Sequence, residues 1–160
     1  MIAAVSDATT LIVLAKLGRA ELLSALFSRV LIPEPVLKEI CAKDDYDHAV
    51  WRSEPFELVP ASTSPLYGDL RAILDEGESA AIAAAAESAM PLIIDEKKGR
   101  SVAASLGVKV IGLAGILVAL KRTGRYEGSE LLAVLDRAEA IGYRLSDSLK
   151  RELSALLAGA

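Results

Sequence analysis

Cysteine, histidine and aromatic residues are scarce in this chain of 160 residues. It has one cysteine, one histidine and 4% aromatic residues. The single Cys41 excludes an internal disulfide, and its place in the segment EPVLKEICA predicts a small buried side chain rather than a nucleophile. The single His48 argues against zinc sites and against acid–base chemistry that depends on histidine.

Excess positive charge and long apolar runs are also missing. The net charge is -4, so nucleic-acid binding would have to use a local basic patch or a metal ion. The longest run of apolar residues and glycine, GLAGILVAL at 112–120, is far shorter than the ~18 residues of a membrane span. The N-terminal stretch has no basic region and is interrupted by Asp7, unlike a signal peptide. We therefore expect a cytoplasmic protein with no membrane partner.

Short apolar runs alternate with helical patterns along the chain. We expect strands at 2–6, 30–32, 56–59, 91–94 and 108–112. Helices are expected at about 9–17, 20–27, 33–41, 75–89, 97–107, 113–123, 129–141 and 146–158, with a polar helix at 44–53 and a loop at 61–68. This alternation predicts parallel strands joined by right-handed crossovers. The expected fold is a single domain, residues 1–160, built as a three-layer α/β/α sandwich with a mainly parallel central sheet.

Two aspartates follow expected strands directly. Asp7 comes after IAAVS and Asp95 comes after PLII. The carboxyl ends of parallel strands are where open α/β sheets build their sites. Carboxylates gathered there repel one another unless a hard divalent cation balances their charge. The other interpretation of Asp7, as the N-cap of the following helix, is equally consistent with the sequence.

Two glutamates lie on helices near these positions, and each also has a purely structural interpretation. Glu39 can be a solvated flank beside the apolar stripe of its helix. Glu78 follows Asp75 by three residues, the spacing of a capping box. Of the neighbouring pair Asp95 and Glu96, we expect Asp95 to point into the crevice at the strand ends and Glu96 to support it.

Five segments, in this order along nearly the whole chain, resemble PIN-domain proteins: SDATTLIVLAKLG, IPEPVLKEI, GESAAIAAA, LIIDEKKGRSVAASLGVKVIG and GYRLSDSLKREL. The nearest resemblance is to an uncharacterised branch related to VapC-type toxins. It implies a PIN-like fold with four acidic residues that hold Mg²⁺ or Mn²⁺ and cleave RNA phosphodiester bonds. The matching catalytic and metal-binding positions are Asp7, Glu39, Glu78 and Asp95.

The matches are not all identical to the family pattern. Thr9 corresponds to the small hydroxyl or amide residue that the family carries two positions after the first aspartate. Thr10 stands where this branch commonly has proline, and Glu78 stands where many PIN domains have aspartate. Carboxylates alone suit the implied chemistry, because Mg²⁺ prefers oxygen ligands and keeps several waters. A bound ion would activate water and stabilise the attacking and leaving oxygens.

An anionic site must still accept anionic RNA. Lys97, Lys98 and Arg100 follow Asp95 at the start of a helix and are candidate phosphate contacts. An exposed basic face is the other interpretation of the two lysines. Arg100 has the additional support that the family resemblance includes an arginine in this region.

Apolar residues are abundant in the two N-terminal helical segments. We expect most of them in the core and some in a homodimer surface or a groove for an antitoxin protein, as in toxin–antitoxin relatives. They are Leu11, Val13, Leu14, Leu17, Leu22, Leu23 and Leu26.

The features above leave three functions open. The favoured one is a metal-dependent endoribonuclease, the toxin of a toxin–antitoxin pair. The alternative is a catalytically inactive PIN-fold module that binds nucleic acid or acts as a scaffold.

A third function, a receiver-like or phosphatase-like domain with Asp7 as phosphoacceptor, has less support. A phosphatase of the DxD kind needs an aspartate at position 9, where Thr9 stands. A receiver needs a lysine at the end of its last strand, and the residues GLAG that follow VKVI contain none. The resemblance to PIN-domain proteins implies RNA as the substrate.

Overall fold

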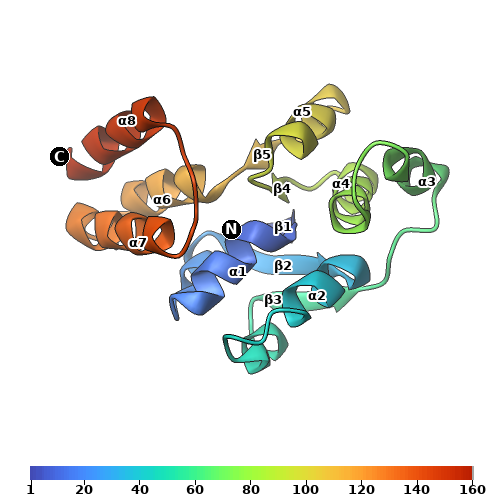
Figure 1. Cartoon of the computed structure of the whole chain (residues 1–160), viewed down its shortest axis with the longest axis horizontal. Coiled ribbons are helices and arrows are strands. Elements are labelled where there is room, and N and C mark those ends of the chain that lie inside the picture. Colours follow the sequence, from blue (N-terminus) through green and yellow to red (C-terminus); the bar gives the residue numbers. More distant parts are fainter. Residues whose placement is uncertain (160) are drawn as a thin grey trace.

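A five-stranded parallel sheet forms the centre of the computed structural model, which describes residues 1–159 (Figure 1). The strands are β1 (Ile2–Ser6), β2 (Phe27–Pro33), β3 (Phe56–Val59), β4 (Leu92–Ile93) and β5 (Val110–Ile111). They lie in the order β3-β2-β1-β4-β5, and every neighbouring pair is parallel. This confirms the predicted α/β sandwich with a parallel central sheet.

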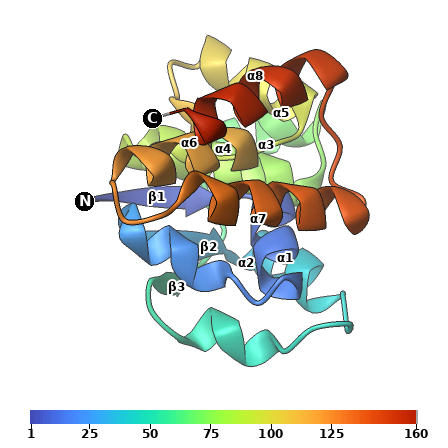
Figure 2. The same cartoon turned by 90° about the vertical axis from the view of Figure 1, so that its left-hand side faces the viewer.

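Eight α-helices and two 3₁₀-helices surround the sheet in residues 1–159. They are α1 (Ala8–Lys16), η1 (Ala20–Ala25), α2 (Glu34–Cys41), η2 (His48–Arg52), α3 (Pro65–Arg71), α4 (Glu76–Ser88), α5 (Lys97–Ser105), α6 (Leu113–Arg122), α7 (Gly128–Ala140) and α8 (Asp147–Ala158). Right-handed crossovers in this strand order put α1 and α2 on one face of the sheet and α4 and α5 on the other. The last three helices pack on one another at one end of the molecule (Figures 1 and 2).

The core is aliphatic, as the composition predicts. Ala4 and Val5 of β1 are fully buried because helices cover both faces of the sheet. The N-terminal apolar residues lie mostly inside as well. Six of the seven are buried, namely Leu11, Val13, Leu14, Leu17, Leu22 and Leu23, and Leu26 is half-buried. The interpretation of most of them as core residues is confirmed, and the homodimer or antitoxin surface stays a prediction.

Four local predictions were wrong. Segment 61–68 is not wholly a loop, because Ser64 and Pro65 begin helix α3 and its Leu70 is buried. Segment 44–53 forms only the short η2, and segment 20–27 forms a 3₁₀-helix followed by the start of β2. Cys41 is exposed rather than buried. It follows the buried Ile40 by one residue, and a step of about 100° turns it away from the packed stripe of α2.

Helix ends follow the predicted chemistry at two places. The Asp75 carboxylate accepts a hydrogen bond of 2.8 Å from the backbone N–H of Glu78 and so caps α4. Gly107 has φ +77° just after α5, a left-handed conformation that glycine adopts at little cost. Within residues 1–159, no helix is both long enough and apolar enough to cross a membrane.

Candidate functional site

Asp7 lies at the carboxyl end of the central strand β1 and precedes α1. Only 5% of its surface is exposed, and its Oδ1 has no hydrogen-bond partner in residues 1–159. It occupies the N-cap position, but its side chain makes no capping hydrogen bond. Burial, together with the nearby carboxylates of Glu39, Asp75 and Asp95, raises the pKa of Asp7 to about 7, although the backbone N–H of Ala8 opposes the rise. A cap role therefore does not explain this residue.

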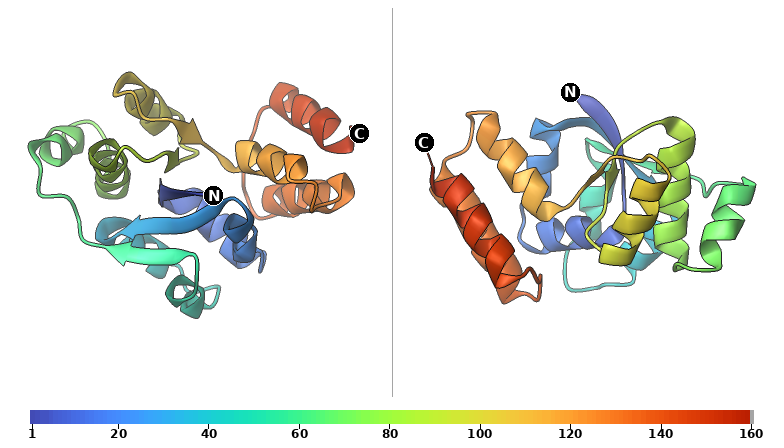
Figure 3. Two further views of the ribbon diagram at one scale, coloured as in Figure 1. Left: turned by 180° about the vertical axis from the view of Figure 1, so that it is seen from behind. Right: turned by 90° about the horizontal axis from the view of Figure 1, so that it is seen from above.

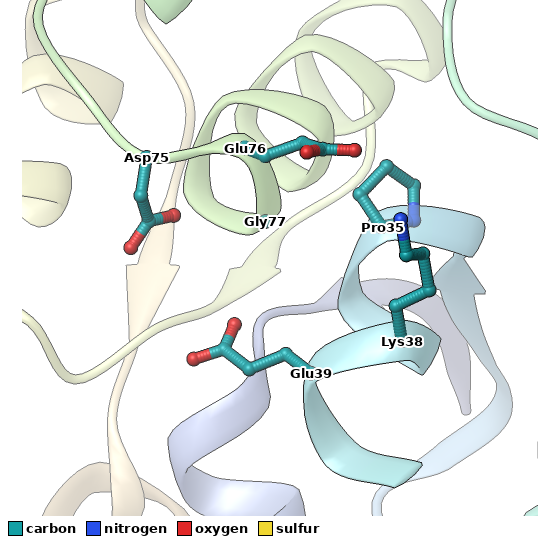
Figure 4. Close-up of a pocket in the computed structure, with 6 residues that line it drawn as sticks. All are labelled: Pro35, Lys38, Glu39, Asp75, Glu76 and Gly77. Atoms are coloured by element: carbon teal, nitrogen blue, oxygen red, sulfur yellow. The ribbon is translucent and has the colours of Figure 1, made fainter. Parts of the chain in front are cut away.

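Carboxylates from three elements converge at Gly77, in the first turn of α4. A Cβ at this glycine would lie 2.8 Å from Glu39 Oε2 and 3.7 Å from both Asp7 Oδ1 and Asp75 Oδ1. A side chain here would displace the Glu39 carboxylate, so glycine leaves room for the carboxylates at the helix N-terminus, whose partial positive charge favours them. In Figure 4, Glu39 and Asp75 turn their carboxylates toward the same space beside Gly77.

This space is the mouth of a cavity of about 270 Å³ between α2 and the start of α4. Desolvation raises the pKa of Glu39, and the charge of Asp75 adds to the effect while Lys43 opposes it. The solvated-flank interpretation of Glu39 is incomplete, since the residue is exposed but its head faces other carboxylates.

Glu78 and Glu96 form a second acidic pair at Gly99, in the first turn of α5. A Cβ at Gly99 would lie 2.8 Å from Glu78 Oε2 and 3.5 Å from Glu96 Oε2. Glu96 caps α5 by accepting a 2.8 Å hydrogen bond from the N–H of Gly99, which lowers its pKa. Glu78 is buried and its Oε2 has no donor among residues 1–159. Burial and proton sharing with Asp75 and Glu96 raise the pKa of Glu78 to about 9.

Asp95 is held in place by three donors from distant parts of the chain. Its Oδ1 accepts hydrogen bonds from the Tyr143 hydroxyl (2.8 Å) and the N–H of Leu113 (3.0 Å). Its Oδ2 accepts a hydrogen bond from the Thr10 hydroxyl. Asp95 faces the start of α6, whereas Glu96 faces α5. The two acids therefore meet donors from different helices at this edge of the sheet.

The basic candidates lie on α5 and the hydroxyl candidates on α1. Arg100 is half-buried, and its Nη1 donates a 2.9 Å hydrogen bond to the carbonyl of Ile94. Lys97 and Lys98 are exposed on the first turn of α5. Thr9 is exposed and makes no side-chain hydrogen bond with residues 1–159, whereas Thr10 is buried and bonds Asp95.

The carboxylates lie near enough to raise one another's pKa, but they are not assembled as a ready ligand set. No group of three or more His, Cys, Asp or Glu side chains in the described part of the chain is arranged to hold a metal ion. Two observations nevertheless fit a hard cation. All donors are carboxylate oxygens, which Mg²⁺ and Mn²⁺ accept. Asp7 and Glu78 each also direct a buried oxygen without a hydrogen-bond partner into this region.

A parallel sheet with carboxylates gathered at its strand ends defines an α/β protein with a candidate site in the usual place for such sheets. A model of the PIN-domain family DUF3368 matches residues 3–158. The chain belongs to this PIN-domain family, whose fold is in general that of a nuclease. No curated protein and no solved structure matches the chain.

Sequence reasoning missed Tyr143, Thr10 and Asp75 as parts of this region. Tyr143 lies in the segment GYRLSDSLKREL, which contributed to the family resemblance, but nothing local indicates that it reaches Asp95. Thr10 follows Thr9, the predicted supporting residue, and consecutive residues of a helix point to different sides. The spacing of Asp75 and Glu78 predicts Asp75 only as a cap, although its carboxylate also lies near Glu39 at Gly77.

Proposed function

We propose that this protein is a Mg²⁺- or Mn²⁺-dependent ribonuclease that cleaves RNA phosphodiester bonds internally. The observation that carries the proposal is Asp7, an acid buried at the carboxyl end of β1 with an unpartnered oxygen among other carboxylates. Nothing in the packing of residues 1–159 supplies a counter-charge for it. Membership of the PIN-domain family supports the same conclusion.

The metal-holding residues in this proposal are Asp7, Glu39, Glu78 and Asp95. A bound Mg²⁺ or Mn²⁺ would supply a Lewis acid and lower the pKa of attacking water. The chain's own residues position the metal ligands. Thr10 and Tyr143 hold Asp95 by hydrogen bonds, and Asp95 Oδ2 keeps one lone pair free for a metal ion.

Other groups would adjust charge around the substrate. Glu78 has the highest pKa of the set and is the group most able to hold a proton near neutral pH. Glu39 is exposed, with a flexible side chain that can turn toward Asp7. Lys97, Lys98 and Arg100, on the first turn of α5, are the proposed contacts for RNA phosphates.

An RNA cleavage assay tests the proposal. A labelled single-stranded RNA is incubated with the protein and Mn²⁺, Mg²⁺ or excess EDTA. Cleavage is expected only with a metal, and Asp7→Asn is expected to reduce the rate by at least ~100-fold, because loss of a ligand costs no less than loss of its supporting partner. Asp69→Asn on α3 is the matched control, since Asp69 is exposed and makes no side-chain hydrogen bond in residues 1–159. Equal cleavage by Asp7→Asn, or in EDTA, would refute the proposal.

The alternative function is an inactive PIN-fold module that binds nucleic acid or acts as a scaffold. The observation in its favour is the lack of an assembled three-ligand group in residues 1–159. The same assay separates the two, since the inactive module would shift labelled RNA in a native gel but leave it uncut with either metal.

We also propose, on the resemblance to VapC-type toxins, that the nuclease acts as a toxin neutralised by an antitoxin protein and that it forms a homodimer. Expression of the parent chain should then arrest growth while Asp7→Asn should not. Light scattering on the purified chain should give twice the monomer mass. A monomeric mass or unaffected growth would remove the corresponding part of this proposal.

A further inference from the structure

A second cavity, of about 410 Å³, has Asp95 in its wall. It is bounded by β5, by the start of α6 and by the connection between α7 and α8. In Figure 1 this connection runs along the side of the C-terminal helices that faces the sheet, and Figure 3 shows the same grouping from behind and from above. Its volume falls in the range of about 300–1,000 Å³ typical of small-molecule sites.

The walls of this cavity are of two kinds. Aliphatic side chains line one part, including Val110, Ile111, Leu145 and Leu149. Polar groups line the part next to Asp95, namely Arg100, Tyr143 and Arg144. A wall that is apolar over one area and cationic over another fits a ligand with a flat apolar body and an anionic group.

Both arginines keep donors for an external anion. Neither Arg100 nor Arg144 forms an ion pair with a residue in 1–159, and Arg144 makes no side-chain hydrogen bond there. Arg100 uses Nη1 to bond the carbonyl of Ile94, which fixes the guanidinium and leaves its other nitrogens available. Arginine binds phosphate well because its planar fork matches two oxygens.

Tyr143 connects the cavity to the acidic crevice. Its hydroxyl donates a 2.8 Å hydrogen bond to Asp95 Oδ1, so a residue that lines the cavity also holds one of the acids. Asp95 Oδ1 and Arg100 Nη1 also meet at Gly112, where a Cβ would lie 2.7 Å and 2.9 Å from them. An anion held by Arg100 in this cavity would therefore be adjacent to a proposed metal ligand. Aromatic rings and aliphatic walls are the surfaces on which proteins place unpaired bases.

We propose that this cavity binds one nucleotide of a single-stranded RNA, next to the bond that is cut at the acidic crevice. Arg144 and Arg100 contact its phosphate, and Tyr143, Leu145 and Leu149 contact its base. The inference rests on the proposed nuclease function and adds a defined subsite to it. Inorganic phosphate alone would leave the apolar wall uncovered, so a nucleotide is the better fit.

Binding and cleavage by two pocket variants test the subsite. Arg144→Ala removes one phosphate contact, and Arg125→Ala, in the exposed link between α6 and α7, is the control with the same change of charge. In EDTA, Arg144→Ala is expected to weaken binding of a labelled single-stranded oligonucleotide about fivefold or more. It should also reduce the slope of log affinity against log salt by about 0.7, which is the effect of one phosphate contact on a single strand. The control should change neither.

Ala114→Leu tests the base contact, because Ala114 is a half-buried cavity-lining residue of α6 and a larger side chain would occupy the space. It is expected to weaken binding and to change which bases flank the cut, with the thermal midpoint of unfolding measured to confirm the fold. Both cavity variants should raise KM more than they lower kcat.

The outcomes separate the two proposals. A parent that binds RNA without cutting it, and loses affinity on Arg144→Ala but not on Arg125→Ala, would support nucleotide binding in this cavity and overturn both the nuclease and the placement of the nucleotide beside a cut bond. A parent that cuts RNA, with Arg144→Ala and Ala114→Leu both matching Arg125→Ala, would overturn the subsite alone. A parent that neither binds nor cuts single-stranded RNA would overturn both.

Discussion

Burial of Asp7 is expected to make the metal-free protein less stable as the pH rises. The folded-state pKa of about 7 lies above the ordinary value of 3.8, so the folded chain binds the proton more tightly than the unfolded chain does. Below the unfolded value both states are protonated and the stabilisation is complete. It is lost as the pH rises from that value through about 7, because ionisation then favours the unfolded state.

The size of this loss of stability follows from the rise in the pKa of Asp7. Each pKa unit corresponds to about 1.4 kcal/mol, so a rise from 3.8 to about 7 corresponds to roughly 4 kcal/mol in total. Between about pH 5 and pH 8 the share lost is roughly 2–3 kcal/mol. For a domain of this size that loss lowers the midpoint of thermal unfolding by roughly 5–10 °C.

Asp7→Asn should remove this contribution, because the amide does not ionise. Urea unfolding is followed by circular dichroism at several pH values, at constant ionic strength and with EDTA present. Glu78 also has a raised pKa, to about 9, and adds a loss in the same direction in both proteins. The informative quantity is therefore the difference in unfolding free energy between variant and parent, which should grow in favour of the variant as the pH rises.

Asp69→Asn again provides the control and should follow the parent at every pH. Addition of Mn²⁺ or Mg²⁺ at high pH should raise the melting temperature of the parent and have little effect on Asp7→Asn. Parallel stability curves for parent and Asp7→Asn would refute the reasoning, because the carboxyl would then ionise at no cost to the folded state. An equal metal-induced rise in both proteins would separately exclude Asp7 as a ligand.

Three further variants test individual contacts. Tyr143→Phe removes the hydroxyl donor to Asp95; it should lower stability by about 1–2 kcal/mol in urea unfolding and reduce kcat about tenfold, and an unchanged kcat would exclude a positioning role. Gly77→Ala places a Cβ 2.8 Å from Glu39 Oε2; it should weaken Mn²⁺ binding in calorimetry even though alanine favours the helix by about 1 kcal/mol, and retained affinity would remove Glu39 from the ligand set. Arg100→Ala should weaken RNA binding in filter assays, and intact affinity at low salt would contradict its role.

Much of the fold follows from local pattern. The apolar runs at 2–6 and 56–59 coincide with β1 and β3. These strands are bounded by Asp7 and Pro60, which end the apolar pattern abruptly. Helix α3 was not predicted because SPLYG contains the residues of a turn, and a glycine within a helix costs about 1 kcal/mol. Burial of Leu70 in the core offsets that cost, and a local pattern cannot report it.

The candidate site was predictable only where topology decides it. Parallel strands put Asp7 and Asp95 at the same edge of the sheet, so their proximity follows from the alternation of strands and helices. Their orientation does not follow, because it depends on donors 85 and 48 residues away from Asp95, namely Thr10 and Tyr143. The side of the sheet edge on which each carboxylate lies is therefore set by tertiary packing.

The hydrogen bond from Tyr143 to Asp95 can form only late in synthesis, after the strands and the four acids have been made. A ribosome releases the chain from its N-terminus, and domains fold as their segments emerge. A growing chain that ends before residue 143 already carries Asp7, Glu39, Glu78 and Asp95, together with all five strands. It still lacks Tyr143, one of the three donors that hold Asp95. Unfinished copies would therefore hold the acids in a looser arrangement until the last loop folds back onto the sheet.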